Sequence, residues 1–136
     1  MVMEYARNVM GIKDAEHAEI DPDASNLIIS PLTCNLKGSP LEIEITDETL
    51  MISQIYGTKL ISENYYCSYG INPKFQNEIN DKGFKIAGTD NSGEARILEL
   101  KSHDFFVATL FVPQVNSSFE TPNKLITAFL KVQQHN

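Results

Sequence analysis

The fold of this chain is decided by the stretch Phe105-Phe106-Val107-Ala108-Thr109-Leu110-Phe111-Val112-Pro113-Gln114. Its first seven residues carry no charge, which predicts a β-strand covered on both faces, as in the middle of a parallel sheet. The following Val112-Pro113-Gln114 predicts a short turn. Thr121-Pro122 then opens a predicted helix whose inner stripe is Leu125, Phe129 and Val132.

Working outward, the pattern predicts two antiparallel hairpins beside that strand. Apolar residues alternate with polar ones over 41–45, and we expect this strand to pair with a second strand over 50–56 that ends at Gly57. The second hairpin joins strands 84–89 and 95–100 through Asp90-Asn91-Ser92-Gly93. Turn chemistry is enough to explain Asp90 and Glu94 there.

The rest of the chain predicts two more helices, two more strands and a loop. One helix covers 2–10 and stops at Gly11, and the other runs from Asn72-Pro73 to Lys82. Strands are expected at 27–29 and 65–71, with an acidic loop over 14–23 between the first helix and the first strand. No residue caps the start of the first helix, which suggests that an element is missing upstream. These elements suit an α/β sandwich. We expect residues 1–136 to form a single domain that is part of a larger one.

Composition excludes several classes of function. The net charge of −7 argues against nucleic acid and anionic membranes as partners, because both attract basic proteins. The longest apolar run is too short to span a bilayer, and the first residues lack a signal-peptide pattern. The two cysteines, Cys34 and Cys67, are then expected to be free thiols in a cytoplasmic protein, with Cys67 packed among aromatic residues.

The histidines predict neither a metal site nor a catalytic base. His17 lies in the acidic loop, His103 at a surface corner and His135 in the tail, and none has metal-ligand spacing with a cysteine. We therefore expect no metal and no cofactor.

Three segments, taken together, resemble a known domain. They are Glu4–Gly11, Tyr69-Gly70-Ile71-Asn72 and the run from His103 to Pro113. In this order and spacing they are similar to the C-terminal glutamine amidotransferase domain of CTP synthase, and more so to a group of small proteins like that domain. The resemblance implies a three-layer α/β/α sandwich of the class I glutamine amidotransferase (flavodoxin-like) type. This chain would be its C-terminal part, with antiparallel hairpin additions.

The resemblance also implies a catalytic triad, from which this chain departs. Members of this class use a cysteine nucleophile on a tight turn, a histidine base and a glutamate that orients the histidine. Here the histidine position is Val112 and the glutamate position is Gln114, and the nucleophile turn would lie upstream of Met1. Residues 63–68, which in CTP synthases are rich in basic side chains that hold the substrate, contain none here. If a substrate pocket remains, the resemblance puts Tyr65, Tyr66 and Tyr69 in it.

Three hypotheses follow. The first is a non-catalytic homologue, a pseudoenzyme that binds a small molecule such as glutamine or associates with a protein. The alternative is part of a glutamine-hydrolysing, ammonia-supplying enzyme linked to CTP and pyrimidine nucleotide synthesis, completed by an upstream segment. The third is a homo-oligomer, or a complex with a partner chain, that covers an exposed sheet edge.

Overall fold

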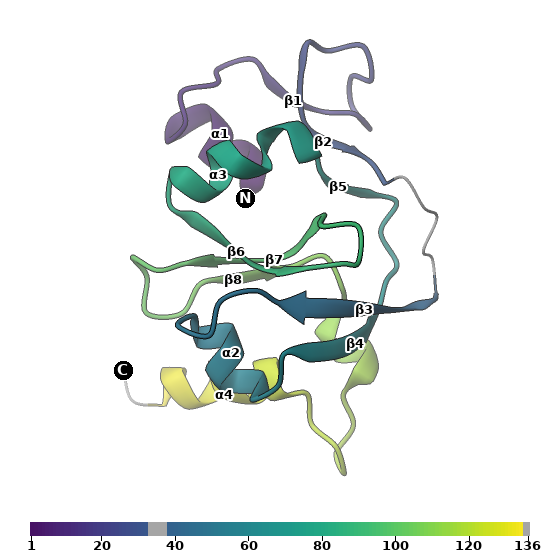
Figure 1. Ribbon diagram of the computed structural model, residues 1–136, viewed down its shortest axis with the longest axis vertical. Helices are drawn as coiled ribbons and strands as arrows, with labels where there is room; N and C mark the ends of the chain where they lie inside the picture. The colour runs from purple at the N-terminus through teal and green to yellow at the C-terminus, as the bar shows by residue number, and fades with distance from the viewer. Residues whose placement is uncertain (33–37, 135–136) are drawn as a thin grey trace.

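A five-stranded antiparallel sheet forms the middle layer of the molecule (Figure 1). The computed structural model describes residues 1–32 and 38–134. The strands of this sheet are β3 (Pro40–Ile45), β4 (Leu60–Asn64), β6 (Phe84–Thr89), β7 (Ala95–Leu100) and β8 (Val107–Thr109), in the order β4-β3-β6-β7-β8. Helices α1 (Val2–Asn8) and α3 (Gln76–Asp81) cover one face, and α2 (Met51–Tyr56) and α4 (Lys124–Gln133) cover the other. The predicted three-layer α/β/α sandwich is confirmed.

A second, three-stranded sheet lies on the α1 and α3 side of the first (Figure 1). Its strands are β1 (Ala15–His17), β2 (Asn26–Pro31) and β5 (Tyr69–Ile71), with β1 parallel and β5 antiparallel to β2. The prediction of a loop over 14–23 is wrong at β1. The acidic residues around this short strand made the segment look like a loop in the sequence. Its first residue, Ala15, is fully buried, and the Ala15 carbonyl accepts hydrogen bonds from Arg7 at 3.1 and 2.8 Å.

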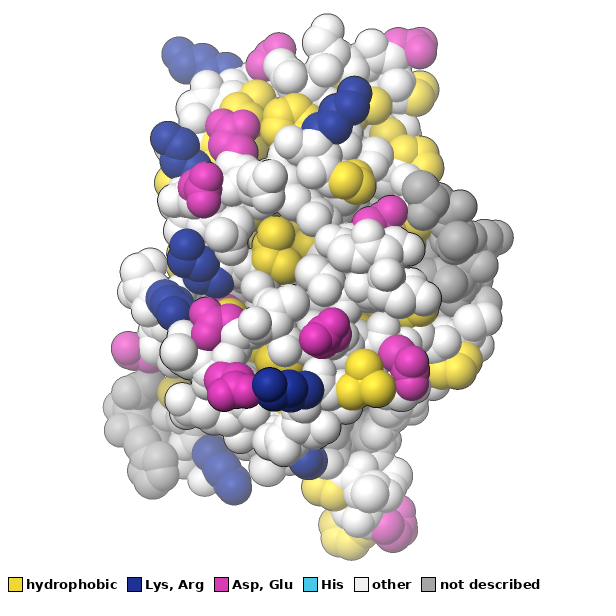
Figure 2. Space-filling model, viewed as in Figure 1, with side chains coloured by type: hydrophobic (Ala, Val, Ile, Leu, Met, Phe, Trp, Pro, Cys, Tyr) yellow, Lys and Arg dark blue, Asp and Glu magenta, His cyan; other side chains and the backbone are white. Residues whose placement is uncertain are grey.

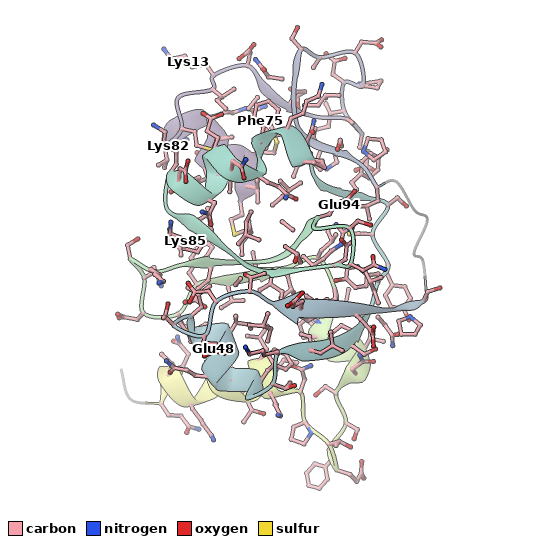
Figure 3. The ribbon with its side chains drawn as sticks, viewed as in Figure 1. Lys13, Glu48, Phe75, Lys82, Lys85 and Glu94 are labelled. Carbon is pink, nitrogen blue, oxygen red and sulfur yellow. The ribbon has the colours of Figure 1, made fainter. Side chains whose placement is uncertain are left out.

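Two apolar cores fill the spaces on either side of the five-stranded sheet, and side chains occupy the gaps between the ribbons (Figure 3). Neighbouring residues of β7 point to opposite cores, Ile97 toward α2 and α4 and Leu98 toward α1 and α3. Five of the six residues of β7 are buried, so β7 is the strand that both helical layers cover. A strand with two charged residues is thus more deeply buried than the uncharged run after it.

The expected position of the uncharged run is wrong. Only Val107–Thr109 form a strand, β8, which lies at an edge of the sheet and pairs antiparallel with β7. Val107 and Ala108 do contact opposite cores, but both remain half-buried. An absence of charge reports contact with apolar neighbours, and it does not distinguish an edge strand from a central one.

Most of the strand predicted over 50–56 is instead the helix α2 (Met51–Tyr56), with Leu50 as its extended N-cap residue. Glu99 on β7 accepts hydrogen bonds from the backbone amides of Met51 and Ile52, both at 3.0 Å, and so fixes the start of α2. Gly57 ends it in the left-handed conformation, with φ of 66°. The first hairpin is therefore β3 with β4, and α2 lies in the connection between them.

Other predicted elements are confirmed with small changes. Asn72 caps a 3-10 turn, η1 (Pro73–Phe75), that leads into α3, and β6 pairs with β7 as the predicted second hairpin. The strand expected over 65–71 is only β5. Asn123 caps α4, within which Leu125 is buried while Phe129 stays 45% exposed against the ring of Phe105.

The surface carries charges of both signs without a concentrated patch on the face shown in Figure 2. Isolated hydrophobic side chains lie among them. Within residues 1–32 and 38–134, no helix has the length and apolar character needed to cross a membrane.

Candidate functional site

A cavity of about 400 Å³ opens between the start of α1, the three-stranded sheet and strands β7 and β8. We call it the α1–β7 cavity. Most of the cavity wall is apolar. Its apolar residues include Val2, Ile29, Ile71, Leu98, Ala108 and Leu110. The polar residues of the wall include His17, Tyr69, Arg96 and Thr109. This volume and this mixture are typical of small-molecule sites.

A buried ion cluster borders the cavity. Arg96 is only 3% exposed, and its Nη2 lies 2.6 Å from Asp90 Oδ2 and 2.8 Å from Glu94 Oε2. The Nε atom of Arg96 has no hydrogen-bond partner among the residues that the structure describes. The sequence prediction assigned Asp90 and Glu94 to the turn alone and missed Arg96. A charged residue between the apolar residues Ala95 and Ile97 was the available signal.

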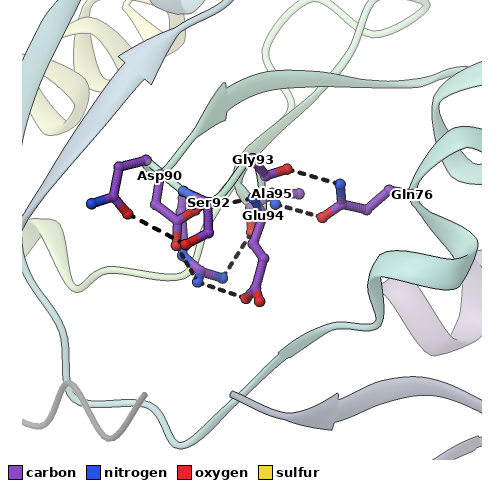
Figure 4. Close-up of polar contacts among 8 residues, drawn as sticks. Gln76, Asp90, Ser92, Gly93, Glu94 and Ala95 are labelled. Carbon is purple, nitrogen blue, oxygen red and sulfur yellow. Dashed lines mark hydrogen bonds and ion pairs between the residues drawn. The ribbon is translucent and has the colours of Figure 1, made fainter. Parts of the chain in front are cut away.

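The turn that carries this cluster is held from two sides (Figure 4). Asp90 Oδ1 accepts hydrogen bonds from the backbone amides of Ser92 at 2.9 Å and Glu94 at 3.0 Å, as expected for an aspartate at a turn. Gln76, at the start of α3, donates to the Gly93 carbonyl at 3.0 Å and accepts from the Ala95 amide at 2.6 Å. These bonds fix the backbone at the start of β7, next to Arg96.

The rim of the cavity brings together residues that are far apart in the sequence. His17 lies on β1 with its ring centroid 5.0 Å from that of Tyr69, and Cys67 contributes to the same wall. His17 Nδ1 accepts a hydrogen bond from the Glu19 amide at 3.1 Å, which assigns the proton of the neutral ring to Nε2. Cys67 is exposed, so the expected packing role is wrong.

The three predicted pocket tyrosines lie in different places. Tyr69 lines the α1–β7 cavity, whereas Tyr66 is 48% exposed and does not. Tyr65 is fully buried in the other core, where its ring packs edge-on against Phe111 with centroids 6.3 Å apart. Burial raises the pKa of the Tyr65 phenol, and its hydroxyl has no partner in the described part of the chain.

The positions of the expected triad lie away from this cavity. Val112 is half-buried and directly precedes a 3-10 turn, η2 (Pro113–Asn116), on which Gln114 is exposed. Neither residue belongs to the cavity wall. The turn is attached to the sheet by Glu63, which is buried and accepts from Asn116 Nδ2 at 2.7 Å.

The remaining candidates do not form a second site. His103 is exposed, as expected, and its Nδ1 accepts a hydrogen bond from the Phe105 amide at 3.3 Å. Cys34 and His135 lie outside the described residues. Within the described ranges, no three His, Cys, Asp or Glu side chains are grouped so that they could hold a metal ion.

Comparisons with known proteins agree with this architecture. The chain is 36% identical over 123 residues to CTP synthase of Drosophila melanogaster, which covers 83% of this chain and 20% of the relative. It is 33% identical over 137 residues to CTP synthase of Bacillus subtilis, covering 94% of this chain and 26% of the relative. No protein-family model matches the chain.

A solved structure shows the same fold. The Trypanosoma brucei CTP synthase glutaminase domain with bound acivicin superimposes with a TM-score of 0.87 at 22% identity, covering 95% of this chain and 54% of that one. Against the full CTP synthases above, the chain spans only 20% and 26% of their length. The chain is therefore homologous to a part of CTP synthase and has the fold of its glutaminase domain, the class I glutamine amidotransferase type.

Proposed function

We propose that this chain is a glutamine-amidotransferase-like protein that does not hydrolyse glutamine and that binds a small molecule in the α1–β7 cavity. The observation that carries the first half is Val112, which stands where the resemblance expects the catalytic histidine. An aliphatic side chain can neither accept nor return a proton, and loss of a general base costs about 10²–10⁴ in rate. The neutral amide of Gln114 likewise replaces the expected carboxylate.

The second half of the proposal is supported by the cavity itself. Its volume of about 400 Å³ lies in the range of ligand sites, and its walls come from six separate stretches of the chain. The turn before Arg96 is held by hydrogen bonds to Gln76 and Asp90, so the chain's own contacts fix this part of the wall.

An ammonia-release assay tests the absence of catalysis. The purified chain is incubated with glutamine beside a CTP synthase glutaminase as the positive control. We expect ammonia at the level of a heat-denatured sample. Release above that level, proportional to protein concentration, would overturn the proposal.

A second candidate function is an ammonia-supplying part of a CTP-forming enzyme of pyrimidine nucleotide synthesis. The similarity to CTP synthases over 83–96% of the chain favours it. In this proposal an upstream segment supplies the nucleophile turn. Translating the DNA upstream of Met1 and assaying the extended protein for ammonia separates the two, because only the second candidate expects activity there.

We further propose that the chain works in the cytoplasm as a homo-oligomer or with a partner chain on the edge strand β8. Edge strands present unpaired backbone groups, and natural proteins commonly cover them. Light scattering of the purified chain is expected to give a mass above that of the 15.2 kDa monomer. A monodisperse monomer would contradict self-association.

A further inference from the structure

We infer that copies of this chain bind one another through two different surfaces, an acidic turn after β1 on one copy and a groove between α2 and α4 on the next. The inference rests on the self-association proposed above and adds a contact away from the edge of β8. The acidic turn is residues 19–23. The α2–α4 groove is lined by residues that include Ile55, Pro122, Lys124, Ala128 and Lys131.

The α2–α4 groove combines an apolar wall with two lysines. Its volume is about 460 Å³, and Ile55, Pro122 and Ala128 supply the apolar part of the wall. Lys124 and Lys131 are seven residues apart on α4, so they lie on one side of the helix and about 10 Å apart along its axis. Neither α2 nor α4 contains an acidic residue. The groove therefore suits an apolar side chain that has carboxylates beside it.

The charges of the two groove lysines are not neutralised by carboxylates of the same copy. Lys124 Nζ donates to the Tyr56 carbonyl at 2.7 Å, and a carbonyl leaves the positive charge uncompensated. Within residues 1–32 and 38–134, neither Lys124 nor Lys131 lies within 4.0 Å of a carboxylate oxygen. Glu48, just before α2, lies 2.7 Å from Lys59 instead. Carboxylates of another molecule can therefore pair with both groove lysines.

The acidic turn presents an exposed aliphatic side chain among carboxylates. Ile20 is 77% exposed, and Asp21 and Asp23 next to it are exposed as well. Residues 14–25 contain five acidic residues and no lysine or arginine. The His17 carbonyl accepts hydrogen bonds from the amides of Ile20 at 2.8 Å and Asp21 at 3.1 Å, which fix the shape of the turn. A turn that is already fixed loses less conformational entropy when it binds.

The turn and the groove complement each other between copies. Figure 1 shows β1 and α4 at opposite ends of the molecule, so the turn cannot reach the groove of its own chain. In the contact between copies, Ile20 packs between Ile55 and Ala128, which removes apolar surface of both copies from water. Asp21 and Asp23 then face the two groove lysines. The net charge of −7 opposes association in general, but this contact brings the acidic end of one copy to helices without acids on the next.

Substitutions of exposed side chains test the contact in the full chain. Light scattering over a range of concentrations measures the association constant of each variant. We expect Lys131→Glu, Asp23→Lys and Ile20→Ser each to weaken self-association about tenfold, which corresponds to about 1.4 kcal/mol. Lys82→Glu makes the same change of charge as Lys131→Glu but lies on the α3 side of the sheet (Figure 3), and this matched control should associate like the wild type. Circular dichroism establishes that each variant is folded.

A mixture of two variants tests whether the contact joins two different surfaces. Lys131→Glu keeps an unaltered turn, and Asp23→Lys keeps an unaltered groove. In an equal mixture the turn of the first variant can meet the groove of the second, so we expect the mixture to associate about tenfold more tightly than either variant alone. For the wild type, about 1 M NaCl shortens the Debye length to about 3 Å and should weaken association.

The outcomes separate this contact from self-association as such. If the wild type associates and folded Lys131→Glu associates equally well, this inference is overturned while the self-association proposed above stands. A mixture that associates no more tightly than its two components also overturns only this inference. A wild-type chain that stays monomeric at every concentration overturns both. Ammonia release from glutamine bears on the proposed absence of catalysis alone.

Discussion

The carboxylate of Glu63 accepts a hydrogen bond from the side-chain amide of Asn116 at 2.7 Å and thereby ties β4 to the turn η2 that follows Val112. Glu63 is 4% exposed and its other oxygen accepts from the Tyr56 hydroxyl at 3.0 Å. Asn116 also accepts from Asn64 at 2.8 Å. The backbone around the lost triad positions is therefore held by a polar network of its own.

Asn116→Ala tests that network. The change leaves a buried carboxylate with one donor fewer, and we expect a loss of about 1–2 kcal/mol in the free energy of unfolding. The measurement is urea denaturation. Asn77→Ala on α3 removes an exposed amide and is the control, expected to change stability by less than about 0.5 kcal/mol. Equal effects of the two variants would contradict a structural role for the Glu63 network.

Glu99→Gln tests the contact that makes residues 51–56 helical. The carboxylate of Glu99 accepts from both Met51 and Ile52, and an amide in its place would turn an NH₂ group toward one of these donors. We expect a loss of about 1–3 kcal/mol, measured by denaturation. Glu42→Gln on the exposed face of β3 is the matched control with little effect. A loss in Glu42→Gln as large as in Glu99→Gln would refute the capping role.

Sequence predicted the elements whose signals are local. The turn at 90–93, the cap at Asn72 and the alternation over 41–45 each depend on neighbouring residues, and all three appear in the structure. Residues 50–56 were predicted wrongly because their apolar content fits a strand or a helix, and the deciding contact comes from Glu99, more than forty residues later.

The candidate site was less predictable than the fold. Val112 and Gln114 could be identified only through resemblance, and their role stays a prediction. Arg96 could not be recognised because its two carboxylates, Asp90 and Glu94, have a sufficient local explanation as turn residues. The cavity is lined by residues of α1, β1, β5 and β8, among others. No sequence pattern predicts that these distant segments lie side by side.

Alkaline pH is expected to destabilise the chain through Tyr56 and Tyr65. Burial raises the pKa of both phenols above the usual 10.0, and for Tyr56 the neighbouring Glu63 carboxylate adds to the shift. Above pH 10.0 the unfolded chain then releases protons that the folded chain keeps, so stability is complete below that pH and falls as the pH rises.

Ultraviolet absorbance of tyrosinate measures this directly. Two of the five tyrosines should ionise only as the protein unfolds, and Tyr56→Phe should leave one such residue. Tyr66→Phe, which removes an exposed phenol, is the control that leaves both. Ionisation of all five tyrosines before any loss of circular dichroism would show that the burial argument is incorrect.

Cys67 is expected to react with thiol reagents in the folded protein. It is a free, exposed thiol that contributes to the wall of the α1–β7 cavity. In a Cys34→Ser background, Ellman's reagent should modify Cys67 without denaturant. The Cys34→Ser, Cys67→Ser double variant gives the background. Reaction only after unfolding would mean that Cys67 is packed, as the sequence first indicated, and that the cavity wall is formed differently.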